Sequence, residues 1–448
     1  MSKRNQHNLA GSVRCYGGDR PLHSRGRRDW CNLPSVLVED IASRLLRYDV
    51  SEYIRLRAVC KEWRNCTAEP REGDIRFRPR RWIMLSNRTD GDGRRFLNLS
   101  TGACARVDLP ELYTQYLETS TEGLLLLRHK SSHAPRLLNP LTRALIDLPP
   151  ITMDLGSAYD VWTGLFVCAS RVIYAGISDE TSPPSVVILM TDGRGRAIVY
   201  AKPGDRRWAV MDDKPWRSLP VSYRYSSAST LHGRFYFATL EGNIMHVRLG
   251  PEPRLVPVVM NQPMSIDNNM FSYLVPLDDH HHHGGGMLMV RYCFSLENFG
   301  AGSRRILKRQ MEQKKCRWNP IQVFEVDLAG ETILPVQDIG RHRAVFVGEV
   351  ACFSMSARTF PCLAGNAVYL GATGVCFPPI GVRYLTDNTV DPAFQFATED
   401  ERIMAMENRG LKGYRQYRPE LNLLPLARPC TLQEYLVCCA GLLGGVKD

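Results

Sequence analysis

The sequence contains no long uninterrupted apolar run, and this absence limits where the chain can reside. Of its 448 residues 44% are hydrophobic, yet no stretch of about 18 apolar residues occurs, so we expect no membrane-spanning helix. The best candidate, Leu432–Val446, is short and carries Glu434. The basic first residues have no apolar run behind them, so we predict no secretory signal and a place in the nucleus, the cytoplasm or both.

Disulfide and metal-ligand patterns are also missing. The chain has 14 cysteines but no C-x-x-C pair and no Cys/His zinc spacing, so we expect reduced thiols in a reducing compartment and no cofactor. His280–His283 could ligate a metal through imidazole nitrogens, but a glycine run follows it, which favours a low-complexity loop. Asp90–Gly93 resembles a fragment of a calcium loop that lacks its downstream glutamate, which favours a tight turn.

Local catalytic motifs are absent as well. The sequence has no G-x-S-x-G elbow, no G-x-G-x-x-G loop, no Walker loop and no H-E-x-x-H helix. We therefore predict a protein that is not an enzyme. An enzyme site assembled from loops that lie far apart in the sequence stays an alternative.

The positive charge of the chain is concentrated in two segments. The net charge is +11, and residues 1–28 and 301–320 each carry seven Lys or Arg residues against one acidic residue. The rest of the chain is therefore close to neutral, which argues against nucleic-acid binding by the whole protein. Residues 1–28 lack periodicity, which predicts a disordered basic tail.

The second basic segment has two candidate roles, nuclear import or contact with phosphate or an acidic surface, and a solvated loop is the alternative. The residues that would form this patch are Arg304, Arg305, Lys314, Lys315 and Arg317.

Residues 33–68 have the periodicity of short amphipathic helices. Leu37, Ile41 and Leu45 recur every four residues after the Leu33-Pro34 pair, as expected for a helix that begins with proline. Asp49 and Glu52 have the spacing of a capping box before a second apolar stripe, which holds Tyr53, Leu56, Cys60 and Trp63. Two or three such helices bury little surface alone, so we expect part of it to meet a partner.

After about residue 75 the residue pattern changes to one that is typical of short strands. Alternating or β-branched runs bounded by turn residues predict strands at 82–85, 124–127, 186–189, 197–200, 234–238, 244–247, 323–326, 344–347 and 367–370. A Leu-Asn, turn, Asp-Leu-Pro unit occurs twice, with Asn98 and Asn139 at the same place in each. A period of about 40–50 residues made of short strands is typical of propeller blades.

These observations divide the chain into three parts. We predict a basic tail over 1–28, a small all-α module over 29–70 and a large all-β domain, a β-propeller, over 75–445. The strand pattern that is typical of blades is lost around 278–318, and we interpret this range as a His/Gly-rich and basic insertion.

The helical segment resembles an F-box. The marks are the Leu-Pro start, the Ile41-x-x-x-Leu45 helix and the Arg57-x-Val-Cys-x-x-Trp-Arg64 ending. The remainder is similar to the plant F-box-associated propellers of the KIB type, on the residues Glu122–Leu127, Leu138–Arg143, His232–Phe237 and Phe360–Leu370. One departure is Cys362, which stands where that family commonly has glycine.

The resemblance implies a function. An F-box binds the Skp adaptor of a cullin-based SCF ubiquitin ligase, and the propeller then recruits an unidentified client protein for ubiquitination. Helix-in-groove docking uses apolar anchors at helical spacing. By position, the resemblance assigns the Skp surface to Leu33, Pro34, Leu37, Ile41, Leu45, Leu56, Val59, Cys60 and Trp63. The alternative is a protein outside any ligase that binds protein or nucleic acid through its propeller and basic segments, with the helices packed against the propeller.

Overall fold

The computed structural model describes most of the chain from Trp30 onward, and all statements below concern those residues. They are 30–70, 74–85, 93–151, 158–160, 165–167, 171–192, 195–211, 225–239, 242–260, 269–277, 286–294, 321–348, 351–370, 381–389, 432, 433, 436 and 439. Among these residues, every helix is too short or too polar to cross a membrane.

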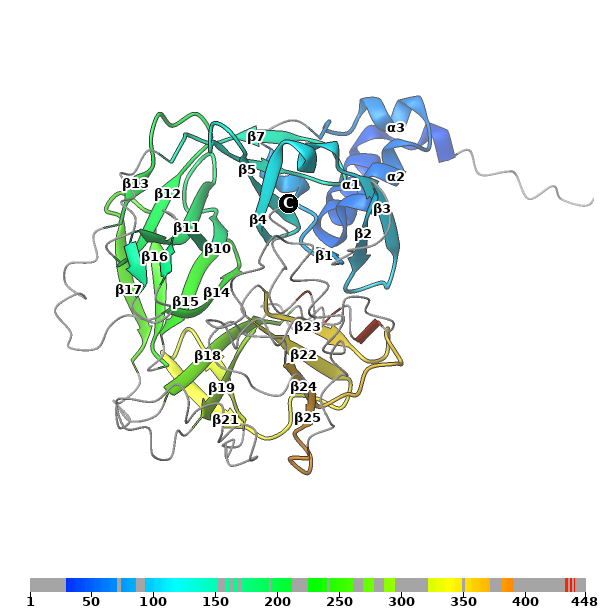
Figure 1. The fold of residues 1–448 in the computed structure, drawn as a ribbon. Coiled ribbons are helices and arrows are strands. Elements are labelled where there is room, and N and C mark those ends of the chain that lie inside the picture. Colours follow the sequence, from blue (N-terminus) through cyan, green and yellow to red (C-terminus); the bar gives the residue numbers. More distant parts are fainter. Residues whose placement is uncertain are drawn as a thin grey trace, which may run out of the picture.

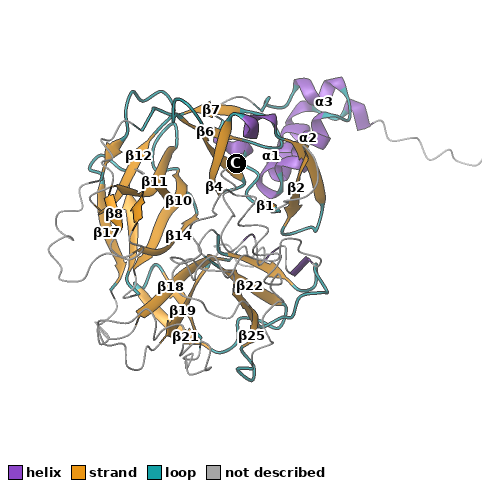
Figure 2. Cartoon of the chain, in the orientation of Figure 1, coloured by secondary structure: helices purple, strands orange, loops and turns teal. Residues whose placement is uncertain are grey.

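Three short α-helices open the described chain and form what we call the helical module, residues 30–70. They are α1 (Ser35–Tyr48), α2 (Val50–Arg57) and α3 (Lys61–Asn65), after a 3-10 turn at Trp30–Asn32. Pro34 is the N-cap of α1, with φ −53° and ψ 137°, so the proline starts the helix as predicted. Figure 2 shows the helices gathered beside strands β1 and β2.

Asp49 is the N-cap of α2, but the predicted capping box is only half present. The Asp49 carboxylate accepts a hydrogen bond from the Ser51 amide. The reciprocal bond is absent because the Asp49 amide donates to the Leu45 carbonyl and the Glu52 carboxylate pairs with Arg55. The predicted box is therefore wrong in its second half, and both Asp49 carboxylate oxygens also accept hydrogen bonds from side chains.

Six sheets follow the module in chain order, one with three strands and five with four within the described residues. Their strands are β1–β3 (Trp82–Met84, Gly93–Asn98, Cys104–Asp108), β4–β7 (Gln115–Thr121, Leu124–His129, Pro135–Leu138, Leu145–Asp147), β10–β13 (Arg171–Ser178, Ser185–Asp192, Gly195–Ala201, Ala209–Val210), β14–β17 (Tyr225–Leu231, Arg234–Thr239, Ile244–Arg248, Arg254–Val259), β18–β21 (Asn269–Pro276, Met287–Phe294, Gln322–Asp327, Thr332–Val336) and β22–β25 (Arg343–Val347, Phe353–Ser356, Ala367–Leu370, Gly381–Tyr384). The short pair β8 (Ala158–Asp160) and β9 (Leu165–Val167) lies between the second and third sheets in the chain. Two 3-10 turns, Ile75–Phe77 and Pro110–Tyr113, complete the elements.

The sheets are arranged in a ring, as Figure 1 shows. The first strands of successive sheets contact one another, β4 with β10, β10 with β14 and β14 with β18, and β18 contacts β22 and β23. Each sheet is a blade, so the domain is a six-bladed β-propeller. The predicted fold class, a small all-α module followed by a large all-β domain, is confirmed.

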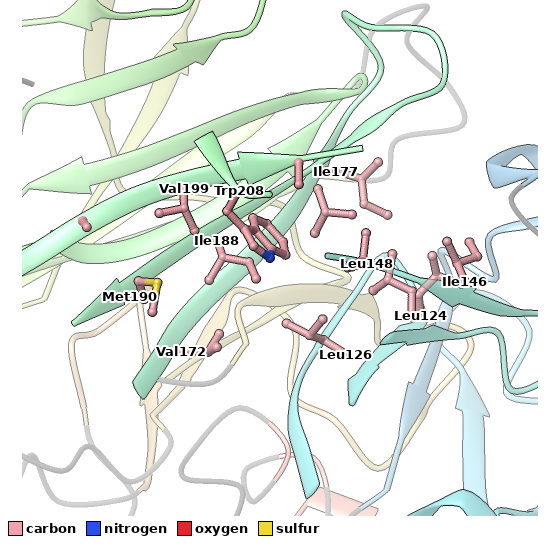
Figure 3. Packing of buried hydrophobic residues seen from close by; sticks show 14 residues of the cluster. Leu124, Leu126, Ile146, Leu148, Val172, Ile177, Ile188, Met190, Val199 and Trp208 are labelled. Carbon is pink, nitrogen blue, oxygen red and sulfur yellow. The ribbon is translucent and has the colours of Figure 1, made fainter. Parts of the chain in front are cut away.

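The core lies between neighbouring blades. Leu124 and Leu126 of β5 pack with Ile188 and Val199 of the next blade (Figure 3), and Trp208 lies in the same cluster. The Trp208 indole nitrogen donates to the Pro149 carbonyl at 2.6 Å. Since each blade is covered on both faces, its middle strands are apolar on both sides instead of alternating, which explains why all four residues Leu124–Leu127 are buried.

The strand predictions hold, and the repeat has a structural meaning. Each predicted strand segment overlaps a strand of the structure. The two Leu-Asn units are the hairpins β2–β3 and β6–β7, which are the last two strands of adjacent blades. Asn98 and Asn139 therefore occupy equivalent turns of two neighbouring blades.

The prediction of one insertion over 278–318 is wrong in its middle. Met287–Phe294 is strand β19, which pairs with β18 and β20. Its residues Met287–Val290 are buried because they pack against the neighbouring blades. The histidine run and the basic patch, residues 280–283 and 304–317, lie outside the described residues.

The last blade departs from a simple up-and-down order. Its strands run β23-β22-β24-β25, and β22 pairs with β24 in parallel. The ring is joined where this blade meets the first one, because Leu97 packs in one cluster with Phe353 and Leu436. There the Thr359 hydroxyl also donates to the Ser100 carbonyl at 3.3 Å.

Candidate functional site

The helical module exposes apolar side chains that its own chain leaves uncovered. On α1, Leu37 and Ile41 are one helical turn apart and are 50% and 40% exposed. Trp30, Val36 and Val59 are more than half exposed. We call these five residues the exposed apolar set. Large exposed apolar side chains that occur together, rather than singly, are typical of an interaction surface.

The opposite side of the module is sealed against the propeller. Val38 and Ala42 of α1 are buried with Tyr53 and Leu56 of α2, together with Val50. This cluster continues into the linker through Phe77, whose ring centroid lies 5.3 Å from that of Tyr53, and it reaches Leu141 of the β6–β7 turn. The inner face therefore has a partner within the chain, and the outer face has none among the described residues.

The residues predicted for docking divide into three groups by exposure. Pro34, Leu37, Ile41 and Val59 are exposed, and Leu33, Leu45, Cys60 and Trp63 are partly buried. Leu56 is buried in the module core, at 6% exposure, so it supports the surface from below and does not form it. Trp30 and Val36 are exposed but were not predicted, because neither falls on the four-residue spacing that identified the stripe.

The short helix α3 is held by side chains that were predicted to dock. The Cys60 sulfur caps α3 by accepting from the Trp63 amide at 3.4 Å. The Trp63 indole nitrogen donates to the Trp30 carbonyl at 3.2 Å, which ties the first 3-10 turn to α3. Hydrogen bonds from its own backbone amide and from the Cys60 side chain lower the pKa of Glu62. A carboxylate therefore stays charged at the start of α3, where it is favoured by the helix dipole.

Two arginines on the basic face of α2 and α3 have a structural role. The Arg57 guanidinium donates to the Arg64 carbonyl at 3.1 Å and to the Ala68 carbonyl at 2.9 Å. Arg64 returns a bond to the Arg57 carbonyl at 3.1 Å. These bonds satisfy carbonyls at the ends of α2 and α3 that no helix turn follows, so they fix the angle between the two helices.

The linker from the module to the propeller is anchored by two ion pairs that Arg78 makes. Arg78, whose side chain is 3% exposed, lies 2.6 Å from Glu122 of the β4–β5 turn and 2.8 Å from Asp179 after β10. Burial raises the pKa of Glu122, and the charges of Arg78 and Arg80 oppose that rise. Removal of Arg78 would take the nearest cation away from the buried Glu122 carboxylate, which is costly.

A small hollow lies on the propeller. Its volume is about 360 Å³, and His232, Arg234, Tyr236, Leu328 and Ala329 line it. In the part of the chain that the structure describes, no cluster of three or more His, Cys, Asp or Glu side chains could bind a metal.

Comparison with known proteins agrees with these features. The F-box domain family matches residues 30–73, and the KIB1-4 beta-propeller family matches residues 96–387. The second match covers more than half of the chain. The chain is an F-box protein, and it belongs to the KIB1-4 beta-propeller family.

A curated relative points to plants. "F-box protein At4g00893" of Arabidopsis thaliana is 25% identical over 215 residues, which are 48% of this chain and 50% of the relative. The chain therefore spans about half the length of the curated relative that it matches.

Solved structures have only a loose likeness to the chain. A Synechocystis apocarotenoid oxygenase mutant is 13% identical with a TM-score of 0.28, over 74% of this chain and 66% of that one. A mutant of AofleA from Arthrobotrys oligospora is 11% identical with a TM-score of 0.29, over 60% and 71%.

Proposed function

We propose that this protein is the substrate-recognition subunit of an SCF-type ubiquitin ligase. Its F-box would dock onto the Skp adaptor through the exposed apolar set, and its propeller would hold a client protein. The observation that carries this proposal is the division of α1 into two apolar faces. Val38 and Ala42 point into the module core, whereas Leu37 and Ile41 remain in water.

This division is hard to explain by folding alone. An apolar side chain that stays exposed in the folded state contributes little to stability, and full burial of one such side chain is worth about 1.5–3 kcal/mol. Single exposed apolar residues are ordinary. Here several belong to one module of about forty residues, and that module is matched by the F-box family. A partner that covers them would gain the burial that the chain itself does not use.

The proposed mechanism requires no catalytic group on this chain. One end of the molecule binds the ligase and the other binds the client, so the two are linked through a single chain. Linkage of this kind raises the effective concentration of one partner near the other to about the millimolar range for short connections. Ubiquitin transfer would then be performed by the other ligase subunits.

The test is the affinity of the purified chain for a purified plant Skp protein, measured by calorimetry. We expect the double variant Leu37→Asp, Ile41→Asp to bind at least about a hundredfold more weakly, because truncation or charging of central apolar anchors costs several kcal/mol. The matched control is Leu334→Asp, since Leu334 is 57% exposed on β21 of the propeller. This control should bind Skp like the unaltered chain.

Unaltered Skp binding by the double variant, with the module still folded by circular dichroism, would refute the proposed docking surface. A chain that does not bind any Skp protein would refute the ligase role itself.

A further inference from the structure

The junction between the F-box and the propeller is centred on a buried carboxylate. Asp49 is 6% exposed and accepts four hydrogen bonds. Two come from its own helix, from the Ser51 amide at 2.9 Å and the Ser51 hydroxyl at 2.7 Å. The other two come from the propeller, from the Trp82 indole nitrogen at 3.0 Å and the Asn98 amide nitrogen at 2.8 Å. The same side chain thus begins α2 and holds the first blade.

The equivalent turn of the next blade makes the same kind of contact. The Asn139 amide nitrogen donates to the Phe77 carbonyl at 2.8 Å, and Phe77 is the linker residue whose side chain packs against the core of the module. Both asparagines are buried. Each one also closes its own turn, because its side-chain oxygen accepts from the two backbone amides that lie two and three residues ahead.

A third blade shows that the turn alone does not need an asparagine. Asp327 ends β20 and occupies the same position in the β20–β21 turn. Its carboxylate accepts from the Ala329 amide at 3.0 Å and the Gly330 amide at 2.9 Å. Aspartate and asparagine offer the same acceptor for such a turn, but only asparagine carries an N–H donor. The two blades that meet the F-box side have asparagine, and this blade has aspartate.

We propose that Asn98 and Asn139 are positioning residues that hold the F-box on the propeller in one fixed orientation through their amide donors. We call the hydrogen bonds from Asn98 and Trp82 to Asp49, and from Asn139 to Phe77, the latch. Asp49 is its principal acceptor. The two Leu-Asn units that mark blades in the sequence therefore have a second role at this junction.

The surrounding contacts fit a junction with a single geometry. The Arg81 guanidinium lies over the Tyr48 ring at 4.9 Å from the centroid, and Tyr53 packs on Phe77. A buried carboxylate is stable only when its partners are in place, and a rotated module would leave it without two of its four donors. Apolar contacts alone would tolerate sliding, whereas this set of directed bonds does not.

The consequence rests on the proposed function. A fixed F-box keeps the docking surface on α1 at a constant position relative to the propeller, so a bound client would face the ligase at a constant distance. Loss of the latch should then lower ubiquitin transfer while Skp affinity stays the same, because Leu37 and Ile41 are not altered.

The test is hydrogen–deuterium exchange of the full chain, followed by mass spectrometry, on the variants Asn98→Asp and Asn139→Asp. Each substitution keeps the acceptor that closes the turn and removes the donor to the F-box side. We expect the backbone amides of α1, α2 and residues 77–82 to exchange faster in both variants. For Asn98→Asp the increase should be about ten- to a hundredfold, the range that matches the loss of a hydrogen bond to a charged group. For Asn139→Asp it should be smaller, because the lost acceptor is the neutral Phe77 carbonyl. Asn98→Asp should have the larger effect because it faces a carboxylate.

The matched control is Asp327→Asn, which adds a donor at the equivalent turn away from the F-box and should leave the exchange of α1 and α2 unchanged. The rescue is the double variant Asp49→Asn, Asn98→Asp, in which donor and acceptor exchange places across the junction. We expect this double variant to recover most of the lost protection, which a role of Asn98 in turn closure alone would not produce.

Unchanged exchange in α1 and α2 of Asn98→Asp would overturn the proposal. So would faster exchange spread evenly over all blades, since that result would mean that the asparagine only stabilises the propeller. These outcomes do not depend on any ligase subunit. A chain that shows the expected exchange but binds no Skp would refute the proposed function and leave the latch intact.

Discussion

At the scale of single residues, the F-box gives the same residue type two different tasks. Leu37 and Leu56 lie on consecutive helices, but Leu37 is half exposed and Leu56 is 6% exposed in the module core. The sequence assigned both to the docking surface because both follow a helical spacing. Only the packing of α2 against α1 and Phe77 separates the residue that would touch a partner from the residue that supports it.

We predict opposite effects for the two leucines. Leu56→Ala should lower the free energy of unfolding by about 2–5 kcal/mol, because it removes buried methyl groups and leaves a cavity. Leu37→Ala should change the free energy of unfolding by no more than about 0.5 kcal/mol, as usual for a surface position. Urea unfolding followed by far-UV circular dichroism measures both. Equal destabilisation by the two substitutions would contradict the assignment of Leu37 to the outer face.

At the scale of elements, a tight hairpin supports the linker that carries the F-box. The β4–β5 turn consists of Glu122 and Gly123, both in the left-handed region, with φ 48° and φ 79°. A Cβ atom on Gly123 would lie 1.9 Å from the Pro79 carbonyl oxygen. The linker backbone therefore passes directly over this glycine, and Glu122 beside it pairs with Arg78.

We predict that Gly123→Ala costs clearly more than the usual penalty for alanine in the left-handed region. Gly204 is the comparison, since its φ is 90° but no atom lies within 4 Å of a Cβ there. Gly204→Ala should cost about 1–2 kcal/mol from backbone conformation. Gly123→Ala should exceed this value and should speed tryptic cleavage after Arg81, because the linker must move. Equal costs and an unchanged cleavage rate would argue against close packing of the linker on the hairpin.

At the scale of the whole molecule, ring closure relies on residues far apart in the chain. Leu436 is fully buried in the cluster that joins the last blade to Leu85 and Leu97 of the first blade. The Cys439 thiol donates to the Met84 carbonyl at 3.3 Å. These residues lie beside β1, the edge strand of the three-stranded sheet, so they cover an edge that would otherwise be unpaired.

We predict that Leu436→Ala destabilises the propeller by about 2–5 kcal/mol. Met260→Ala is the control, since Met260 is 54% exposed and its truncation should be nearly neutral. Thermal unfolding followed by tryptophan fluorescence compares the two. A midpoint for Leu436→Ala equal to that of the control would show that the C-terminal residues do not hold the ring closed.

Much of this architecture is readable from the sequence because it depends on local spacing. Leu37, Ile41 and Leu45 predict the helix α1, runs such as Leu124–Leu127 predict the strands, and the paired Leu-Asn units predict blades. A periodic apolar pattern reports which elements form, since each element buries one face or both.

Tertiary structure alone decided how the parts meet. The partners of Asp49 are Trp82 and Asn98, which lie 33 and 49 residues away in the sequence. The parallel pairing of β22 with β24 depends on which edge of the last sheet remains open for pairing. The single insertion predicted over 278–318 was wrong in its middle because the apolar strand β19 pairs with β18 and β20. The local sequence pattern indicates which side chains of each segment are buried. Which segments pack together depends on the whole chain, because all the blades must fit into one closed ring.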